Sequence, residues 1–136
     1  MLRITAEATL GELTLAVEAE VGAGECLALA GPSGAGKTSV LRVISGLLRP
    51  RRGVVWCGDR VWLDTGRGID LSPDERRCGY VFQDYALFPH LTAWQNVAYA
   101  LTRLPRRERR ARALELLERF GLGARADARP RTLSGG

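Results

Sequence analysis

The chain has 136 residues, 46% of them hydrophobic and 26% charged, and a formal net charge of +5 at pH 7. This composition is typical of a globular domain and excludes a disordered or fibrous chain, and the length is sufficient for one domain with its own core. No apolar run approaches the roughly 20 residues of a membrane-spanning helix, and the first residues lack the apolar block of a signal peptide.

The basic residues are unusual in kind and in position. Lys37 is the only lysine among the 20 basic residues, and all the others are arginine. Residues 103–131 contain ten arginines and four acidic residues, a net charge of +6, whereas residues 1–102 have a net charge of −1. The positive charge of the chain is therefore concentrated in one late segment.

The three cysteines are odd in number and widely spaced, at Cys26, Cys57 and Cys78. We expect them to be small apolar residues in strands rather than metal ligands or redox centres. Free thiols indicate a reducing compartment, the cytoplasm.

Strands are predicted in the first part of the chain. Residues 2–8 and 13–21 alternate between apolar and polar side chains, which predicts two antiparallel strands joined by a turn near Gly11. The unbroken apolar run at 26–30 predicts a strand that is buried on both faces.

A glycine-rich loop follows at 31–36, and a helix is predicted over 37–48 from the spacing of its apolar residues. These are Val40, Leu41, Ile44, Leu47 and Leu48. Short strands are predicted at 53–56 and 61–63, before a polar loop over 65–77 in which Ser72-Pro73-Asp74-Glu75 begins a one-turn helix.

The remaining elements are a strand at 79–82 and helices over 92–101 and 106–120. The last helix is expected to expose its arginines and to bury a stripe formed by Ala111, Leu114, Leu117 and Phe120.

The segment Gly31-Pro32-Ser33-Gly34-Ala35-Gly36-Lys37-Thr38 matches the phosphate-loop pattern G-x-x-x-x-G-K-[ST]. Its glycines let backbone N–H groups approach phosphate oxygens closely, and the helix that follows adds the positive end of its dipole. We expect Lys37 to reach the β- and γ-phosphates, Thr38 to ligate Mg²⁺, and Ser39 to offer its hydroxyl to the α-phosphate. The sequence therefore predicts a nucleotide-binding site.

Two later segments narrow the class of nucleotide-binding protein. Gln83 lies at the predicted strand end before an aromatic-rich loop, and the chain ends with Leu133-Ser134-Gly135-Gly136. Taken alone, Gln83 is typical of a surface amide, and the last four residues are typical of a helix start that is capped by serine. Together with the phosphate loop, in this order and approximate spacing, they resemble the ATP-binding subunit of ABC transporters. The segments 67–80 and 88–90 resemble the oxyanion importers, above all those for molybdate, with sulfate or another small solute as alternatives.

The resemblance implies an α/β fold with a P-loop NTPase core. An antiparallel β subdomain would belong to the core over residues 1–84, and the α-helical subdomain of the family would begin over residues 85–136. ATP and Mg²⁺ would be the cofactors, with Thr38 and Gln83 on the metal and Gln83 as the catalytic residue beside the attacking water.

The resemblance also implies partners. Ser134, Gly135 and Gly136 would contact ATP bound to a second ATP-binding subunit in a head-to-tail dimer. The loop from Ala86 to Leu91 and the helix with Trp94, Asn96 and Tyr99 would meet a transmembrane permease, which places the subunit peripherally on the cytoplasmic side of the membrane. A solute-binding protein would act indirectly.

Two departures from the family pattern lead to further expectations. The family's acidic strand, catalytic glutamate and switch histidine would follow the signature, so the chain is expected to be the N-terminal part of a longer domain or a truncated gene product, with weak nucleotide binding at best and negligible hydrolysis. No aromatic residue precedes Trp56, so the adenine base is expected to rest on aliphatic surface near Leu10 to Leu13.

Three alternatives to a transporter subunit are open. The arginines of 103–112 favour a nucleic-acid-binding module, but no nucleic-acid motif accompanies them, and nucleic acid is not an expected partner. A non-transport ABC ATPase and a nonfunctional remnant are the remaining alternatives.

Overall fold

A computed structural model describes residues 1–11 and 13–133 of the chain, apart from the side chains of Leu10 and Leu13. The chain divides into two units, Met1–Tyr80 and Val81–Gly136, each with its own apolar core. Within the described ranges, no helix is both long and apolar enough to cross a membrane.

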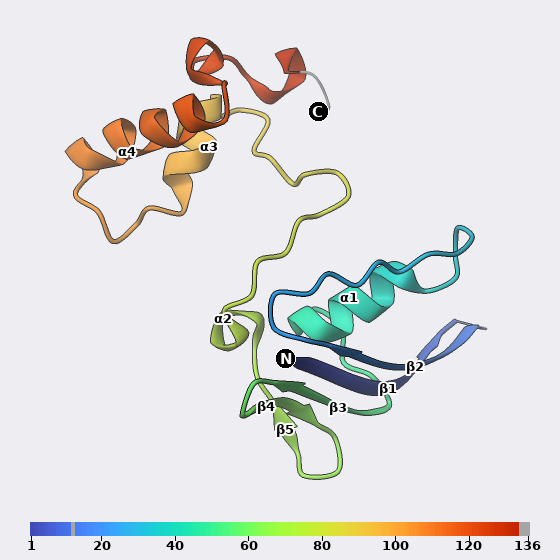
Figure 1. The fold of residues 1–136 in the computed structure, drawn as a ribbon. Coiled ribbons are helices and arrows are strands. Elements are labelled where there is room, and N and C mark those ends of the chain that lie inside the picture. Colours follow the sequence, from blue (N-terminus) through green and yellow to red (C-terminus); the bar gives the residue numbers. More distant parts are fainter. Residues whose placement is uncertain (12, 134–136) are drawn as a thin grey trace. The chain divides into compact units, whose positions relative to one another are not determined.

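The first unit contains a five-stranded antiparallel sheet in the order β2-β1-β3-β4-β5 (Figure 1). The strands are β1 (Leu2–Leu10), β2 (Leu13–Val21), β3 (Arg52–Cys57), β4 (Arg60–Asp64) and β5 (Ile69–Asp70). The alternation predicted for the first two strands is confirmed, because every second residue of β1 from Ile4 to Ala8 is buried and the residues between are exposed. The strands near 53–56 and 61–63 are also confirmed, whereas β5, of two residues, is too short for a sequence pattern to predict.

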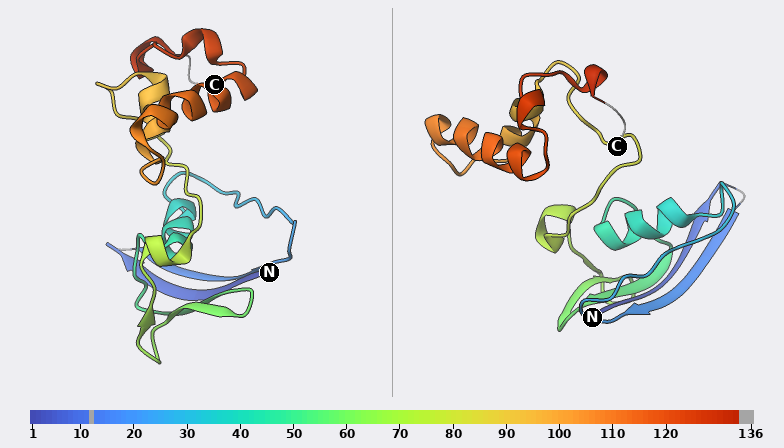
Figure 2. Two further views of the ribbon diagram at one scale, coloured as in Figure 1. Left: turned by 90° about the vertical axis from the view of Figure 1, so that its left-hand side faces the viewer. Right: turned by 45° about the horizontal axis from the view of Figure 1, so that its top comes forward.

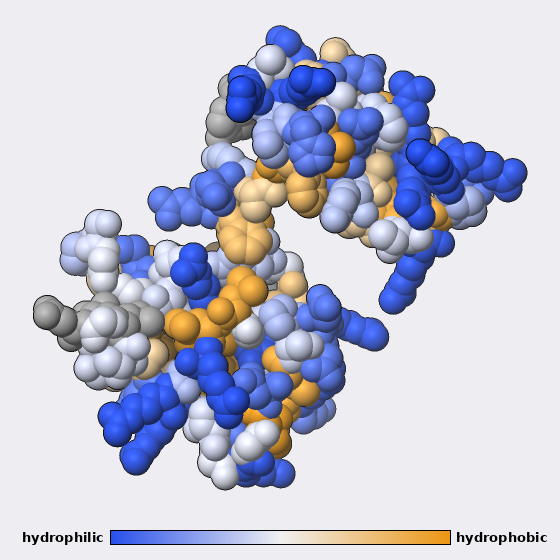
Figure 3. Space-filling model, turned by 180° about the vertical axis from the view of Figure 1, so that it is seen from behind, coloured by the Kyte–Doolittle hydropathy of each residue, from blue (hydrophilic) through white to orange (hydrophobic). Residues whose placement is uncertain are grey.

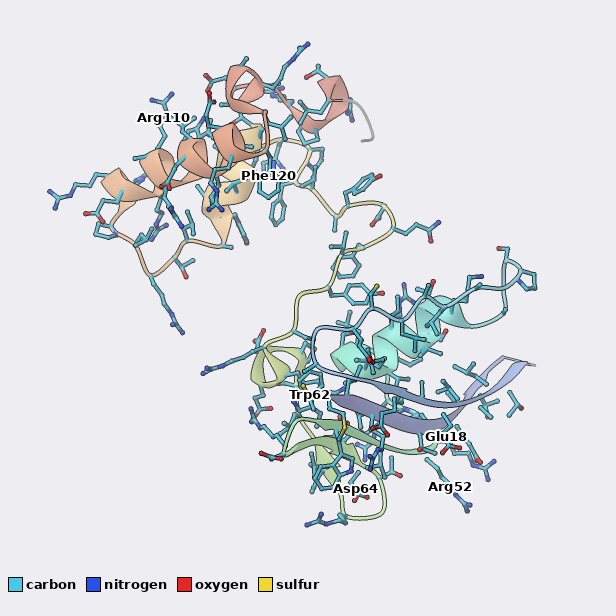
Figure 4. All side chains as sticks on the ribbon, in the orientation of Figure 1. Glu18, Arg52, Trp62, Asp64, Arg110 and Phe120 are labelled. Carbon is cyan, nitrogen blue, oxygen red and sulfur yellow. The ribbon has the colours of Figure 1, made fainter. Side chains whose placement is uncertain are left out.

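Helix α1 (Lys37–Ser45) packs on one face of this sheet (Figures 1 and 2). Its Val40 and Val43 join a core that the sheet supplies with Ile4, Ala6, Val55, Trp62 and Leu63. Full burial of one such aliphatic side chain contributes about 1.5–3 kcal/mol. The opposite face of the sheet is charged, and Glu18 and Arg52 point away from α1 (Figure 4).

Helix α1 ends three residues before the predicted boundary. Gly46 adopts φ 82°, its N–H donates to the carbonyl of Val43 at 3.2 Å, and the N–H of Leu47 donates to Arg42 at 2.8 Å. This left-handed cap terminates the helix. Leu41 and Leu47, which were expected on its apolar side, are 48% and 45% exposed, and Val43 is fully buried instead.

The strands predicted at 26–30 and 79–82 are absent from the described part of the chain. Leu27 and Val81 are 50% and 84% exposed. A strand forms only when a neighbour satisfies its backbone N–H and C=O groups, and among the described residues no segment pairs with either run. An apolar run alone could not reveal this.

The cysteines are free thiols, but only one lies in a strand. Cys57 belongs to β3 and packs against the core, as expected. Cys26 is exposed in the run 26–30, where the predicted strand does not form, and Cys78, outside any strand, is half-buried and also packs against the core.

A buried arginine links the end of α1 to the segment that follows the sheet. Arg76 is the last residue of α2 (Pro73–Arg76), which starts at the predicted position with a capping box between Ser72 and Glu75. Arg76 is 4% exposed, and its guanidinium donates hydrogen bonds to Val43 O (2.7 Å), Ile44 O (2.7 Å), Leu71 O (2.8 Å) and Asp70 Oδ1 (3.2 Å). Burial lowers the pKa of Arg76 and the carboxylate of Asp70 opposes that shift, so the side chain stays a cation at the negative end of α1.

The second unit contains α3 (Ala93–Tyr99) and α4 (Arg106–Arg119), followed by the 3-10 turns η1 (Gly123–Arg125) and η2 (Pro130–Thr132). Both helices form where they were predicted, although α3 is shorter. Thr92 caps α3 by accepting from the N–H of Gln95 at 3.4 Å, while the Gln95 side chain accepts from the N–H of Thr92 at 2.9 Å. Ala93, Leu117 and Ala126 form the buried core of this unit.

The buried face of α4 differs from the predicted stripe. Ala113 and Leu117 are buried, whereas Ala111 is exposed and Phe120 is 79% exposed (Figure 4). The helix stops at Arg119, Gly121 turns with φ 70°, and the N–H of Leu122 donates back to Leu117 at 2.8 Å. Phe120 therefore lies outside the helical periodicity that predicted its burial.

Replacing Arg76 by methionine is expected to destabilise the first unit by about 3 kcal/mol, because the substitution leaves buried carbonyl groups and Asp70 without their donor. The measurement is urea unfolding in a Trp94→Phe background, in which the remaining tryptophans, Trp56 and Trp62, both report on the first unit. The matched control is Arg77→Met at the exposed neighbour, which should change stability by less than about 0.5 kcal/mol. Equal losses in the two variants would contradict the assigned role of Arg76.

Candidate functional site

The loop at 31–36 turns sharply at its glycines. Gly31, Gly34 and Gly36 have φ values of 149°, 82° and 87°, which L side chains rarely adopt. The N–H of Ala35 donates to Pro32 at 3.3 Å, and α1 begins immediately after Gly36. The first amides of a helix have no partner within the helix, and the first turn of α1 contains neither a side-chain cap nor an acidic residue. This arrangement favours an anion at the start of α1.

Lys37 is held against the beginning of the same loop. Its Nζ donates to the carbonyl oxygens of Gly31 at 2.8 Å and Pro32 at 2.6 Å. An ammonium group has three donors, so one N–H remains for a ligand after these two hydrogen bonds. The compact ammonium fits this ring, and a wider, planar guanidinium would present its donors in a different geometry.

Strand β2 packs against the junction between the loop and α1. A Cβ atom at Gly36 would lie 2.9 Å from Cδ1 of Leu15, whereas a Cβ at Gly34 would have no atom within 4 Å. A side chain at Gly36 would therefore need a left-handed backbone and a shift of the flexible end of Leu15, whereas at Gly34 only the backbone conformation opposes a side chain.

The hydroxyl groups expected to serve a nucleotide lie in the same segment. Ser33 and Thr38 are exposed and Ser39 is half-buried, with Thr38 and Ser39 in the first turn of α1. The structure thus brings the predicted residues 31–39 together in one continuous loop and helix start.

The other predicted site residues lie elsewhere in the chain. Gln83 belongs to the second unit and is exposed on a turn in which Tyr85 and Ala86 adopt φ 59° and 48°. Positive φ at two successive non-glycine residues stores backbone strain. The signature residues Ser134, Gly135 and Gly136 lie outside the described ranges, as do the side chains of Leu10 and Leu13, on which the adenine was expected.

The sequence did not reveal the role of Asn96, which was expected on a partner-facing surface. Its Oδ1 accepts from the N–H of Phe88 at 2.9 Å, and its Nδ2 donates to Phe88 O, Leu91 O and Thr92 O at 3.2, 3.3 and 3.0 Å. The amide therefore anchors the loop before α3. The sequence contained one indication of this role, because an Asn one turn after the helix cap at Thr92 can donate to the Thr92 carbonyl and reach the loop before it.

Comparison with known proteins identifies the chain. The sequence model of a family described as ABC transporter matches residues 15–136. The chain belongs to the ABC transporter family. This confirms the resemblance inferred from the phosphate loop, the glutamine loop and the signature.

Several curated relatives match nearly the whole of this chain. The chain is 46% identical over 136 residues to the molybdenum import ATP-binding protein ModC of Rhodospirillum rubrum, covering 100% of this chain and 36% of that protein. It is 42% identical over 135 residues to the molybdate/tungstate import ATP-binding protein WtpC of Archaeoglobus fulgidus, covering 99% and 53%. It is also 44% identical over 130 residues to the trehalose/maltose import ATP-binding protein MalK of Thermococcus litoralis, covering 93% and 35%. The chain thus spans about a third to a half of the length of these relatives.

A solved structure confirms the fold class. The dimeric ATP-binding cassette MJ0796, in a post-hydrolysis state bound to ADP and Pi, matches with a TM-score of 0.76 and 32% identity over 99% of this chain and 64% of that one. The α/β cassette fold, with an antiparallel β part and a helical part, is therefore confirmed for this chain.

The different roles of the loop glycines can be measured. Gly34→Ala should cost about 1–2 kcal/mol from the left-handed backbone alone, and Gly36→Ala should cost about 1 kcal/mol more because the end of the Leu15 side chain must move to admit the new methyl group. Urea unfolding checks both values. In a double-mutant cycle, Leu15→Ala should recover about 1 kcal/mol of the cost of Gly36→Ala and none of the cost of Gly34→Ala. Equal costs at the two glycines would refute the packing argument.

Proposed function

We propose that this chain is the ATP-binding part of an ABC importer of molybdate, which binds MgATP on residues 31–39. The observation that carries the proposal is the loop between Gly31 and Gly36, with its glycine turns, the Lys37 ammonium on its carbonyl groups and the uncapped start of α1. Names of relatives add support, since ModC and WtpC import molybdenum or molybdate. A trehalose/maltose import protein has a similar identity of 44%. The assignment of molybdate therefore rests on the larger number of molybdenum and molybdate import proteins among the relatives.

The chain's own residues would bind and orient the triphosphate. Backbone N–H groups of 33–38 would surround the phosphate oxygens, and the remaining N–H of Lys37 would reach the β- and γ-phosphates. The hydroxyl of Ser39 would reach the α-phosphate.

Magnesium fits the donor chemistry at the start of α1. The Thr38 hydroxyl is a hard, neutral oxygen ligand of the kind that Mg²⁺ accepts beside phosphate oxygens, and the Gln83 amide oxygen is of the same chemical kind. The bound ion would supply neutralisation of the charge on the transferred phosphoryl group. Gln83 would orient the attacking water without changing its own protonation state.

The proposed assembly has three partners. Ser134, Gly135 and Gly136 would contact the ATP of a second subunit in a head-to-tail dimer. Exposed side chains of the loop from Ala86 to Leu91 and of α3, among them Leu87, Phe88 and Tyr99, would dock on a transmembrane permease. The subunit would act peripherally on the cytoplasmic side of the membrane, and a solute-binding protein would supply the solute to the permease.

Replacing Lys37 by arginine should weaken binding of a fluorescent ATP analogue at least about tenfold, because the guanidinium cannot keep both loop carbonyls and reach the phosphates. The matched control is Arg112→Lys on α4, where the exposed ion pair with Glu115 needs only a positive charge. Fluorescence titration in the presence of Mg²⁺ should give the control the affinity of the unmodified chain. Full binding by the Lys37→Arg variant would refute the proposed site.

Base preference is a separate test. Since no aromatic residue precedes Trp56, no ring from residues 1–55 can stack on adenine, an interaction worth about 0.5–1.5 kcal/mol. Competition titrations with ATP and GTP should therefore give affinities within about threefold of each other. Strong selectivity for ATP would contradict the proposed aliphatic surface.

A further inference from the structure

The segment that leads to the signature residues contacts the first turn of α3. After α4 ends at Arg119, the chain forms the short turns η1 and η2. Leu133, which directly precedes the signature serine in the sequence, is half-buried and packs against the core of the second unit. Since short 3-10 turns have poor hydrogen-bond geometry, the position of this segment depends on its contacts with the helices.

Hydrogen bonds join this segment to the start of α3. The N–H of Ala93 donates to Ala128 O at 2.8 Å, and the N–H of Trp94 donates to Ala126 O at 3.0 Å. The first amides of a helix have no partner within the helix, so the segment supplies the acceptors that these amides lack. The indole Nε1 of Trp94 also donates to Asp127 Oδ1, at 3.1 Å.

The ring of Trp94 is held from α4 as well. The guanidinium of Arg110, labelled in Figure 4, lies 5.3 Å from the ring centroid, which is within the range of a cation–π contact. Trp94 therefore connects α3, α4 and the segment before the signature, and Asp127 accepts its only side-chain donor.

The apolar core of the second unit is small, so polar contacts contribute to the order of this segment. Leu117 is joined in that core by the two alanines Ala93 and Ala126, and alanine buries little apolar area. The space-filling view shows long hydrophilic side chains projecting from this unit, with apolar surface exposed among them (Figure 3). A hydrogen bond from an indole to a carboxylate is charge-assisted and stronger than one between neutral groups.

We propose that Trp94 and Asp127 are positioning residues for the signature. Their hydrogen bond fixes residues 126–133 on α3, so that the signature residues meet the ATP of the second subunit from an already ordered segment. Fixing a segment before association lowers the entropic cost of association. This inference rests on the proposed function, because both residues act through the signature in ATP-dependent dimerisation.

The first measurement is the motion of this segment in the full chain without nucleotide. NMR relaxation at the amides of Ala128 and Leu133 should show larger local motion after Asp127→Ala or Trp94→Phe. Trp94→Phe keeps an aromatic ring for Arg110 and removes the N–H donor. Asp127→Asn keeps an Oδ1 acceptor, and its relaxation should match that of the unmodified chain. Because Trp94 is half-buried and Asp127 is exposed, the unit should remain folded, and the amide signals of α4 check this in each variant.

The second measurement is dimerisation of the full chain with MgATP, by analytical ultracentrifugation. Asp127→Ala and Trp94→Phe should each raise the dimer dissociation constant at least about fivefold, and Asp127→Asn should stay within about twofold. The double variant Trp94→Phe/Asp127→Ala should be no weaker than the single variants, because both remove the same hydrogen bond. Binding of the fluorescent ATP analogue should be unchanged in every variant, since the phosphate loop belongs to the first unit.

The matched control is Glu115→Ala, which removes one carboxylate from an exposed ion pair in the same unit. Its dimer dissociation constant should stay within about twofold of that of the unmodified chain. An equal loss in this control would indicate that the charge of the unit, and not the contact with Trp94, governs dimerisation.

Several results would overturn the inference. Unchanged motion in Asp127→Ala and Trp94→Phe would refute the role of the hydrogen bond, as would equal losses in Asp127→Asn and Asp127→Ala or additive losses in the double variant. Variants with a mobile segment and normal dimerisation would refute the positioning role and leave the proposed function intact. A chain that binds ATP without dimerising would contradict the proposed assembly and this inference together, but not the nucleotide site.

Discussion

The guanidinium of Arg76 stabilises the end of α1, because it donates hydrogen bonds to the carbonyl groups of Val43 and Ile44 at the C-terminus of that helix. Those groups have no partner within the helix, and Gly46 leaves the space for the cation, since a Cβ there would lie 2.9 Å from its Nε. The opposite end of the same helix begins at the phosphate loop. Both termini of α1 therefore complement its dipole: a cation lies at the C-terminus, and the N-terminus can accept an anion.

The features that could be predicted from the sequence are those that depend on neighbouring residues. The alternation in 2–8 and 13–21, the phosphate-loop motif and the one-turn helix after Ser72 each need only local information. Arg76 could not be found in this way. Its position after a helix start is typical of an exposed charge, and its burial depends on a carbonyl 33 residues away in the sequence.

The strand predictions at 26–30 and 79–82 were wrong for a related reason. Apolar character indicates that a segment can be buried, but the hydrogen bonds of a strand come from another segment, which the pattern does not contain. The burial of α4 was misjudged at Phe120 because one glycine turn, at Gly121, changes the direction of the chain. Residues 31–39 of the candidate site are contiguous and could be predicted as one segment, whereas the packing of Leu15 against Gly36 comes from a distant strand and could not.

The two units differ in net charge. Residues 1–80 contain ten basic and ten acidic residues, so the excess of +5 belongs entirely to residues 81–136. At physiological ionic strength, exposed charges act over only about 8 Å, so the α4 arginines influence what lies against α4. Arginine is suited to α4 because only positive charge and hydrogen-bond donors are needed in that helix. At the phosphate loop, a single small ammonium must bond two carbonyl groups and still offer a donor, which explains why the one lysine of an arginine-rich chain is found at this position.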